Sequence, residues 1–369
     1  MTSTAAVADR ILESNAAHTA LRVAGRGSWL DAGRPVQHAT PMSLAELTGV
    51  VEYTPGDLTI TVRAGTSLAE IERVTAGERQ WLALDPPGAG DGTIGATIAT
   101  ASAGPLAHAF GSPRDHVLGL EVVTGTGVRI TTGGRVVKNV AGFDLTRLFT
   151  GSWGTLGVIT EVTMRLRGLP ERDETVAVAV DDGASNIEAL ATKLRGMAIA
   201  PIALELLNTE LARRLSLGKK ATLLARLAGN GDAVRSQRAV LASLGSTADA
   251  PADAWTTLRR CEPAGSSVLR LSRAPSHIAE MWALAHALGV APLAHASLGR
   301  GVVRVMLSEP DANFAETLRA SSATVIAERL PGAAWNGWSF GALDPLSHRV
   351  KRRYDPANVL NPGILGGGA

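Results

Sequence analysis

Cysteine is almost absent from this sequence, since its 369 residues include only Cys261. A single thiol cannot form an internal disulfide, a CxxC redox pair, or a four-cysteine iron–sulfur or zinc site. The eight histidines include no pair spaced H-x-x-x-H, which argues against a helical metal site, and we predict no metal ligands. Any redox chemistry of this chain therefore depends on an organic cofactor.

Strong net charge and long apolar runs are lacking too. The 36 basic residues nearly balance the 34 acidic ones, and no run of Lys or Arg exceeds three residues, which disfavours nucleic-acid binding. The uncharged stretch 92–113 is rich in Gly, Ala, Ser and Thr but lacks the Leu, Ile and Val density of a transmembrane helix. Asp9, Arg10 and Glu13 stand where a signal peptide would need an apolar stretch. We therefore expect a cytoplasmic protein without a transmembrane segment.

Glycine, in contrast, is abundant: 40 of the 369 residues are glycine, about 11%, against about 7% in an average protein. Residues 81–160 hold 15 of these glycines and only 10 charged residues. Glycine concentrated where charge is scarce indicates backbone held close to a bulky polar group, because an ordinary core needs no such excess. The 45% of hydrophobic residues suffices for a buried core, which excludes wholesale disorder.

Hydrophobic periodicity changes near residue 170. Before it, strand patterns dominate, at 58–64, 117–123, 128–131 and 157–166. Ser67-Leu-Ala-Glu70 is a capping box that opens a short helix. After it, strands are predicted at 174–180, 202–207, 221–227, 268–272, 302–307 and 324–329, and helices at 185–197, 232–244, 277–288 and 312–320. This alternation predicts an α+β layer of ferredoxin-like units side by side.

The last 40 residues form a separate piece. Asp344-Pro345 is typical of a helix N-terminus, and the helix should run to about Tyr354. We expect His348 and Lys351 on a solvated face of this helix. Just before it, Trp335 and Trp338 either pack in an aromatic core, which is the default, or form the wall of a pocket.

The sequence Gly90-Asp-Gly92-Thr-Ile-Gly95 matches the G-x-G-x-x-G pattern of dinucleotide-binding Rossmann folds. That pattern should follow a strand directly and open a regular helix. Here Pro86-Pro87 precedes it and β-branched residues at 97, 98 and 100 follow. We therefore expect an irregular loop whose amides face a phosphate, with an NAD-dependent Rossmann enzyme as the alternative.

Several short motifs occur in a fixed order along the chain. They are Gly25-Arg-Gly27-Ser28, Pro86-Pro87-Gly88 leading into Gly92-Thr-Ile-Gly95, Gly104-Pro105, Gly111-Ser-Pro-Arg114-Asp115-His-Val-Leu-Gly119, Lys138-Asn-Val-Ala-Gly142-Phe-Asp-Leu145, Gly154-Thr-Leu-Gly157-Val-Ile-Thr-Glu161, Lys351, Tyr354-Asp-Pro356 and Asn361-Pro-Gly363. Together they resemble the vanillyl-alcohol-oxidase / p-cresol-methylhydroxylase class of FAD-binding domains, over residues 20–170 and 345–363. The Lys138–Asp144 run is most similar to the smaller flavin subunit of bacterial glycolate oxidase.

The resemblance implies an α+β fold in three segments. Residues 1–170 would form an FAD-binding domain of the p-cresol-methylhydroxylase type, and 171–330 an α+β (ferredoxin-like) cap that binds substrate. Residues 331–369 would return to the FAD domain, which makes that domain two-part. The turn around Gly168–Arg172 is the natural boundary between the first two segments.

The resemblance also implies which residues bind FAD. Gly25–Ser28 and Gly92–Gly95 would grip the pyrophosphate through backbone N–H groups, with glycine allowing close approach. The predicted cofactor-binding set is Gly25, Gly27, Ser28, Pro87, Gly88, Gly92, Thr93, Ile94, Gly95, Gly104, Gly111, Arg114, Gly154, Gly157, Val158 and Ile159. Neither 22–33 nor 84–97 contains the His or Cys that covalent flavin needs in this class, so we predict non-covalent FAD.

The residues that we predict to act on the substrate come from one stretch of the sequence. Larger 2-hydroxyacid dehydrogenases of the class carry a His-x-Gly-Asp-Gly-Asn-x-His signature that serves metal and substrate. The nearest match here, His295-Ala-Ser-Leu-Gly-Arg300-Gly301, keeps one histidine and lacks the Asp and the second His. We predict that His295 accepts the substrate hydroxyl proton and that Arg300 clamps a carboxylate. A polar pair beside a strand is the alternative.

These features predict an FAD-dependent oxidoreductase subunit that oxidises a small 2-hydroxy acid, glycolate being the best guess, by hydride transfer to flavin N5. Because the chain has no cysteines for clusters, electrons would leave to an iron–sulfur subunit, a second flavin subunit or oxygen. Through such partners the protein would reach the inner membrane. The alternative is a non-catalytic FAD-holding or electron-relay subunit of a multi-subunit glycolate or lactate oxidase complex.

Overall fold

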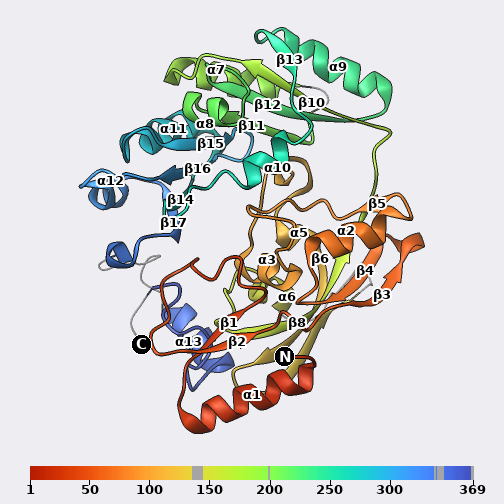
Figure 1. Ribbon diagram of the computed structural model, residues 1–369, viewed down its shortest axis with the longest axis vertical. Helices are drawn as coiled ribbons and strands as arrows, with labels where there is room; N and C mark the ends of the chain where they lie inside the picture. Colours follow the sequence, from red (N-terminus) through yellow and green to blue (C-terminus); the bar gives the residue numbers. More distant parts are fainter. Residues whose placement is uncertain (135–143, 198–199, 336–337, 339–344, 367–369) are drawn as a thin grey trace. The chain divides into compact units, whose positions relative to one another are not determined.

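The chain folds into two compact units. The computed structural model describes residues 1–134, 144–197, 200–335, 338 and 345–366 (Figure 1). Unit 1 comprises Met1–Ala103, Gly111–Leu169 and Gly341–Ala369, and unit 2 comprises Gly104–Phe110 and Pro170–Phe340. Two boundaries differ from the expected ones, because Gly104–Phe110 belongs to unit 2 and because the return to unit 1 begins at 341 instead of 331.

Unit 1 is built on a five-stranded antiparallel sheet with the strand order β3-β4-β8-β6-β7. Its strands are β3 (Val50–Thr54), β4 (Thr59–Arg63), β6 (Val117–Thr124), β7 (Arg129–Gly133) and β8 (Gly157–Arg165). Alternation along β4 and β8 buries Ile60, Val62, Val162 and Met164 in one core. The four strands predicted in this part of the sequence are confirmed, with ends that shift by one or two residues.

Smaller elements complete unit 1. Two short sheets pair β1 (Leu21–Ala24) with β2 (Thr40–Ser43) in parallel and β5 (Gln80–Trp81) with β9 (Arg167–Gly168) antiparallel. The helices are α1 (Thr4–Ala17), α2 (Leu68–Ala76), α3 (Ile94–Thr100), α5 (Pro113–His116), α6 (Leu145–Phe149) and α13 (Pro345–Tyr354), with a 3-10 turn η1 (Pro55–Asp57). At the start of α2, the Ser67 hydroxyl accepts a hydrogen bond from the Glu70 amide (3.2 Å), as the predicted cap requires.

The C-terminal segment returns alongside β1. Leu360 pairs in parallel with Leu21, and the Val23 amide donates to Asn361 Oδ1 (2.8 Å). Figure 1 shows this segment in blue beside the red strands β1 and β2. The C-terminal segment therefore belongs to unit 1 and lies next to its first strand.

The solvated position expected for Lys351 is wrong. Its ammonium is largely buried and donates to Asp355 Oδ2 (2.5 Å), to the Thr155 carbonyl (2.8 Å) and to the Leu360 carbonyl (3.1 Å). Burial lowers the pKa of Lys351, and Asp355 opposes that effect. His348 is exposed, as expected. Lys351 thus fastens α13 to the loop before β8.

Unit 2 contains an eight-stranded sheet, antiparallel throughout, with the order β13-β10-β12-β11-β15-β16-β14-β17. Its strands are β10 (Arg172–Ala179), β11 (Ala203–Leu207), β12 (Thr222–Gly229), β13 (Thr247–Asp249), β14 (Ser267–Ser272), β15 (Leu293–Ser297), β16 (Val302–Leu307) and β17 (Thr324–Arg329). Its helices are α4 (Ala107–Phe110), α7 (Ala184–Arg195), α8 (Thr209–Arg214), α9 (Gly231–Ala242), α10 (Ala254–Arg259), α11 (Ile278–Ala287) and α12 (Phe314–Ala320), with 3-10 turns η2 (Pro275–His277) and η3 (Gly332–Trp335).

Each half of this sheet has the ferredoxin-like βαββαβ arrangement. In both β10–β13 and β14–β17, the fourth, first, third and second strands lie side by side in that order. The two halves join where β11 pairs with β15. The predicted ferredoxin-like units side by side are therefore confirmed. The sequence did not predict β15, the strand that carries His295.

The two faces of the unit 2 sheet differ in what they pack against. One face forms an apolar core with α7, α9 and α11, and Trp335 and Trp338 lie in that core, which confirms the default prediction for them. The other face packs part of its length against α8 and α10. On this second face β11 presents Glu205 two residues before the buried Leu207, and β15 presents His295 directly opposite Leu207.

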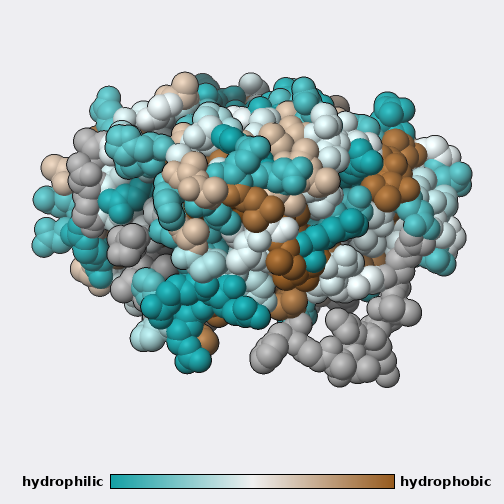
Figure 2. All heavy atoms as spheres, turned by 90° about the horizontal axis from the view of Figure 1, so that it is seen from below, coloured by the Kyte–Doolittle hydropathy of each residue, from teal (hydrophilic) through white to brown (hydrophobic). Residues whose placement is uncertain are grey.

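The surface carries few large apolar side chains. In Figure 2, which views the molecule from the side of α1, small apolar patches are scattered among hydrophilic residues. The exposed apolar side chains of unit 1 include Leu12 on α1 and Val128 before β7. Within the described ranges, no helix combines the length and the apolarity needed to span a bilayer.

Candidate functional site

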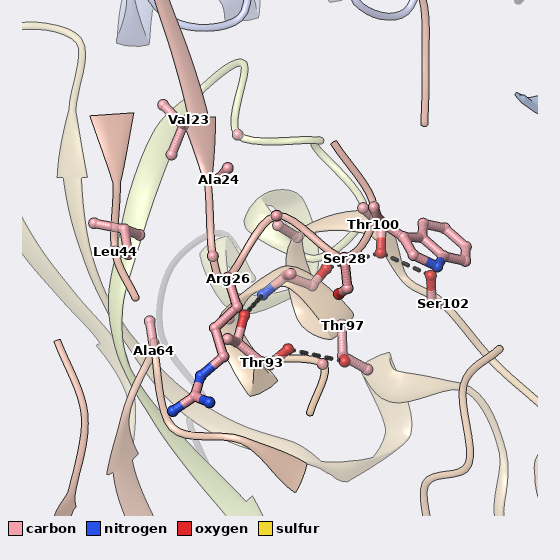
Figure 3. A pocket seen from close by; sticks show the side chains of 18 of the residues that line it. Val23, Ala24, Arg26, Ser28, Leu44, Ala64, Thr93, Thr97, Thr100 and Ser102 are labelled. Carbon is pink, nitrogen blue, oxygen red and sulfur yellow. Dashed lines mark hydrogen bonds between the residues drawn. The ribbon is translucent and has the colours of Figure 1, made fainter. Parts of the chain in front are cut away.

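Unit 1 contains a large pocket, lined mostly by main chain and small side chains. About 1030 Å³ of its space, open solvent at its mouth included, is free of protein atoms. Figure 3 shows Arg26 and Ser28 from the loop after β1, together with Thr93, Thr97 and Thr100 around α3. The lining residues are Arg22, Val23, Ala24, Gly25, Arg26, Gly27, Ser28, Trp29, Leu30, Leu44, Ala64, Pro86, Pro87, Gly88, Ala89, Gly92, Thr93, Gly95, Ala96, Thr97, Ala99, Thr100, Ser102, Trp153, Gly154, Gly157, Val158, Ile159, Asn361 and Ile364.

Two glycine loops present their backbone to this pocket. Gly27 and Gly88 have φ values of +83° and +101°, a conformation that glycine adopts without strain. A Cβ added at Gly27 would meet nothing within 4 Å, so open space lies beside this loop. Among the described residues, the amides of Gly27, Ser28, Gly88 and Ala89 have no acceptor. These amides are therefore available to a ligand.

The third glycine segment serves packing. The amides of Gly92, Ile94 and Gly95 donate to the carbonyls of Ala89 (3.2 Å), Thr66 (2.9 Å) and Ala64 (2.9 Å). An added Cβ at Gly95 would lie 2.6 Å from the Ala64 Cβ. Glycine at 95 thus lets α3 approach β4 closely.

The irregular loop expected for the Gly90–Gly95 motif is present at residues 90–93, but it is wrong from Ile94 on, where the helix α3 begins. The residues after Gly95 continue as the regular helix α3, because the Thr93 hydroxyl caps it by accepting from the Ala96 amide (3.4 Å). The β-branched Thr97 and Thr100 fit this helix, since their hydroxyls bond back to the carbonyls of residues 93 and 96. The neighbouring sheet is antiparallel, so no Rossmann βαβ unit surrounds the motif.

Two further lining residues frame the pocket: Arg22, which the sequence did not predict, and Asn361, which was absent from the predicted cofactor-binding set. Arg22 donates to the carbonyls of Val23, Leu30 and Ala32 (3.1 to 3.2 Å), which closes the loop after β1 on itself. Asn361 donates from its side-chain amide to the Trp153 carbonyl (2.7 Å). The signal for Asn361 was present in the Asn-Pro-Gly turn, whereas no local pattern indicated Arg22.

Unit 2 contains a separate group of polar side chains. His295 Nδ1 lies 2.7 Å from Glu205 Oε2, and the two side chains are 11% and 3% exposed. Leu207 of β11 faces His295 of β15, so Glu205 is a diagonal neighbour on the same face of the sheet. The carboxylate holds the imidazole in the tautomer with its proton on Nδ1, which leaves the Nε2 lone pair as an acceptor. Glu205 was missed, although a charged residue inside an apolar strand signals a buried partner.

Arg300 and His108 lie in the same part of unit 2. Arg300 occupies the turn Leu298–Gly301 between β15 and β16. Gly299 of this turn faces the His108 ring: an added Cβ at Gly299 would lie 2.7 Å from Cε1 and 3.0 Å from Nδ1. Burial lowers the pKa of His108, Glu205 raises it, and Arg300 lowers it. The structure thus brings His295, Arg300, Glu205 and His108 into one cluster.

Cys261 is buried in unit 2 with Sγ 3.6 Å from Met306 Sδ, and burial raises the pKa of its thiol. No group of three or more His, Cys, Asp or Glu in the described ranges is arranged to hold a metal ion.

The structure brings most of the predicted cofactor-binding residues to the pocket. The four that do not line it lie elsewhere: Ile94 is buried in the core of unit 1, Gly104 belongs to unit 2, Gly111 forms a turn (φ +86°) against Asp115, and Arg114 lies on α5. Of the run from Lys138 to Leu145, residues 138–143 lie outside the described residues.

Comparison with known families identifies the first part of the chain. Residues 1–133 match the family described as FAD binding domain. This part of the chain is therefore similar to an FAD-binding domain. The fold of the chain is that of p-cresol methylhydroxylase, whose crystal structure with bound substrate superposes on 100% of this chain and 88% of that chain, with a TM-score of 0.75 and 17% sequence identity. Alkyldihydroxyacetonephosphate synthase shares the fold, with a TM-score of 0.71 and 17% identity over 98% of this chain and 75% of that one.

Some relatives of known sequence match about half of this chain, and others match nearly all of it. The glycolate oxidase subunit GlcE of Escherichia coli is 40% identical over 166 residues, 45% of this chain and 47% of that protein. The subunit GlcD of Bacillus subtilis is 35% identical over 48% of this chain and 37% of its own length. The chain therefore spans less than half the length of these relatives. An FAD-linked oxidoreductase of Mycobacterium tuberculosis is 27% identical over 95% of this chain and 87% of its own length.

The pocket of unit 1 fits FAD. The charged residues among the described lining residues are Arg22 and Arg26, and none is acidic. Cations and free amides are what a pyrophosphate needs. Trp29 and Trp153 add flat surfaces suited to ring systems.

Proposed function

We propose that this chain is an FAD-dependent oxidoreductase of the glycolate or lactate oxidase type, with FAD held non-covalently in unit 1. The observation that carries the proposal is the lining of the pocket: a cationic, backbone-rich surface in unit 1, most of whose residues lie in the part that matches the FAD binding domain family. None of its described lining residues is a His or a Cys, the two attachment residues considered above. Non-covalent binding follows from that composition.

The pyrophosphate of FAD would be held by chain amides and one guanidinium. The amides of Gly27 and Ser28 on one loop and of Gly88 and Ala89 on the other have no acceptor among the described residues. Arg26 adds a positive charge on the first loop. The amides of Gly92 and Gly95 take no part, because they donate within the chain. We therefore propose Gly88 and Ala89 as the second part of the pyrophosphate site, in place of the predicted Gly92–Gly95.

The cluster of unit 2 supplies the groups that a 2-hydroxy acid needs. Bound FAD would supply the hydride acceptor. His295 accepts the hydroxyl proton at Nε2, because Glu205 holds its Nδ1. Arg300 binds the substrate carboxylate as a charge-assisted donor. Glycolate is the substrate that we propose first.

Electrons must then leave the protein. The chain has one cysteine, too few for an iron–sulfur cluster of its own. The names of two relatives describe them as glycolate oxidase subunits. We therefore propose a complex with an iron–sulfur subunit and a second flavin subunit, in the cytoplasm or at the inner membrane through those partners.

One difference between this chain and the family signature favours a second function. The position that aligns with the second histidine of the family signature is Val302. A chain without that histidine could hold FAD as an electron relay while a partner oxidises the substrate. This alternative keeps the FAD site of unit 1 and gives the cluster of unit 2 no part in the reaction.

Three measurements separate these functions. Purified protein should be yellow and release its colour to the supernatant on acid precipitation; a colourless protein contradicts FAD binding, and a yellow pellet contradicts non-covalent binding. Anaerobic glycolate or D-lactate should then bleach the flavin of the isolated chain. If the flavin stays oxidised while the assembled complex turns over, the chain is a relay subunit.

A further inference from the structure

The cluster of unit 2 contains a histidine to which the proposed function gives no task. His108 lies on α4, a four-residue helix of the segment Gly104–Phe110, which belongs to unit 2 although both flanking segments belong to unit 1. Its Nδ1 is buried and has no hydrogen-bond partner among the described residues. A buried polar atom without a partner destabilises a fold by about 1–3 kcal/mol. Such an atom calls for an explanation, and a bound ligand or an ordered water would supply the missing partner.

The surroundings of His108 indicate what kind of ligand this is. The ring packs against Gly299, the residue before Arg300, and α4 contacts β11, which carries Glu205. Burial and the positive charge of Arg300 lower the pKa of His108 against the opposing effect of Glu205. Burial thus favours the neutral imidazole, which can donate one N–H without adding a second charge. A guanidinium and a neutral N–H together suit one small carboxylate.

We propose that His108 is a substrate-binding residue, whose Nδ1–H donates to the carboxylate of a small 2-hydroxy or 2-oxo acid that Arg300 also holds. This inference rests on the proposed function. It extends that function by adding a second histidine to the proposed substrate site, about 190 positions away from the His295 stretch in the sequence. His108 would thus fill the role left open by Val302.

The test uses the FAD-loaded full chain and oxalate as the probe, with binding followed by calorimetry. His108→Leu removes the N–H and keeps an apolar side chain of similar size, so the Kd for oxalate should rise about 10- to 100-fold. His108→Asn keeps an N–H donor near the position of Nδ1 and should bind within about fivefold of the parent. The melting temperature of ligand-free His108→Leu should stay unchanged or rise, since a buried atom without a partner is removed.

A second variant displaces the same ring without changing His108 itself. Gly299→Ala places a methyl group 2.7 Å from Cε1 of His108 and must push the imidazole aside. It should weaken oxalate binding in the same direction as His108→Leu. Gly183→Ala is the control, because Gly183 has φ −62° and its nearest neighbour to an added Cβ lies at 3.5 Å.

The outcomes distinguish the inference from the proposed function. Weaker oxalate binding in His108→Leu and Gly299→Ala, with rescue in His108→Asn and unchanged melting, supports it. If the parent binds oxalate and oxidises glycolate or D-lactate while His108→Leu binds oxalate equally well, the role of His108 is refuted and the proposed function stands. If the parent neither binds oxalate nor oxidises these acids, both are refuted.

Discussion

The pocket of unit 1 and the cluster of unit 2 are built from different parts of the chain. The pocket is shaped by main chain: loops at Gly27 and Gly88 adopt positive φ and present amides. The cluster is made of side chains, with His295 held by Glu205 across two strands. Amides hold a cofactor at fixed places, whereas proton transfer needs groups that titrate. From this comparison we expect cofactor binding and proton transfer to be separable in this protein.

The largest expected effect tests that separation at His295. His295→Gln should lower glycolate turnover about 100- to 10,000-fold, because the base is lost. Its FAD content, measured from the visible absorbance, should stay at the parent level. His277→Gln is the matched control, since His277 also meets a glutamate through Nδ1 (Glu280, 2.9 Å) but lies outside the cluster and is 35% exposed. Loss of FAD in His295→Gln would contradict the separation.

In unit 1, a substitution at Lys351 tests whether FAD binding depends on the stability of the C-terminal segment. Lys351→Met leaves the fully buried Asp355 without its cation and should lower the free energy of unfolding by about 3–5 kcal/mol. FAD should be lost in parallel, since the chain that Lys351 fastens continues into Asn361 and Ile364 of the pocket. Denaturant unfolding measures the change. Lys220→Met, at an exposed lysine, should stay within about 0.5 kcal/mol of the parent.

Gly95 tests how closely α3 must approach β4. In Gly95→Ala the new methyl group would overlap Ala64, and we expect a loss of about 1–3 kcal/mol in unfolding free energy together with weaker FAD binding. Thermal unfolding and FAD titration of the apoprotein measure both. Gly77→Ala is the control, because an added Cβ there has its nearest neighbour at 3.8 Å. If stability and FAD binding are unchanged in Gly95→Ala, α3 can move away from Ala64 without cost.

The smallest expected effect concerns pH and His108. Its pKa is lowered in the folded protein, so the unfolded chain binds more protons as pH falls below about 6.5. The contribution of His108 to stability is therefore complete above that pH and declines below it. Unfolding of the parent and of His108→Leu between pH 5 and 8 should show a gentler acid decline in the variant. Parallel curves would mean that His108 keeps its ordinary pKa.

Local patterns were sufficient for much of the fold. Alternation located β4, β6 and β8, and helices of period 3.6 located α7, α9 and α11, because each element reports its own periodicity. The short β15 escaped prediction, since its five residues show little apolar alternation. The Gly90–Gly95 motif was misjudged in its second half: Thr93 starts a helix in spite of the β-branched residues that follow.

The sequence by itself determined the class of fold, the glycines that line the pocket of unit 1 and the absence of cysteines for a cluster. These properties depend on composition, periodicity and the conformational freedom of single residues. Only the tertiary structure decided that Glu205 holds His295 from 90 positions away, that His108 belongs to unit 2 and that Lys351 is buried. Each of these facts depends on which strands and segments lie next to one another, and strand order leaves no trace in local sequence.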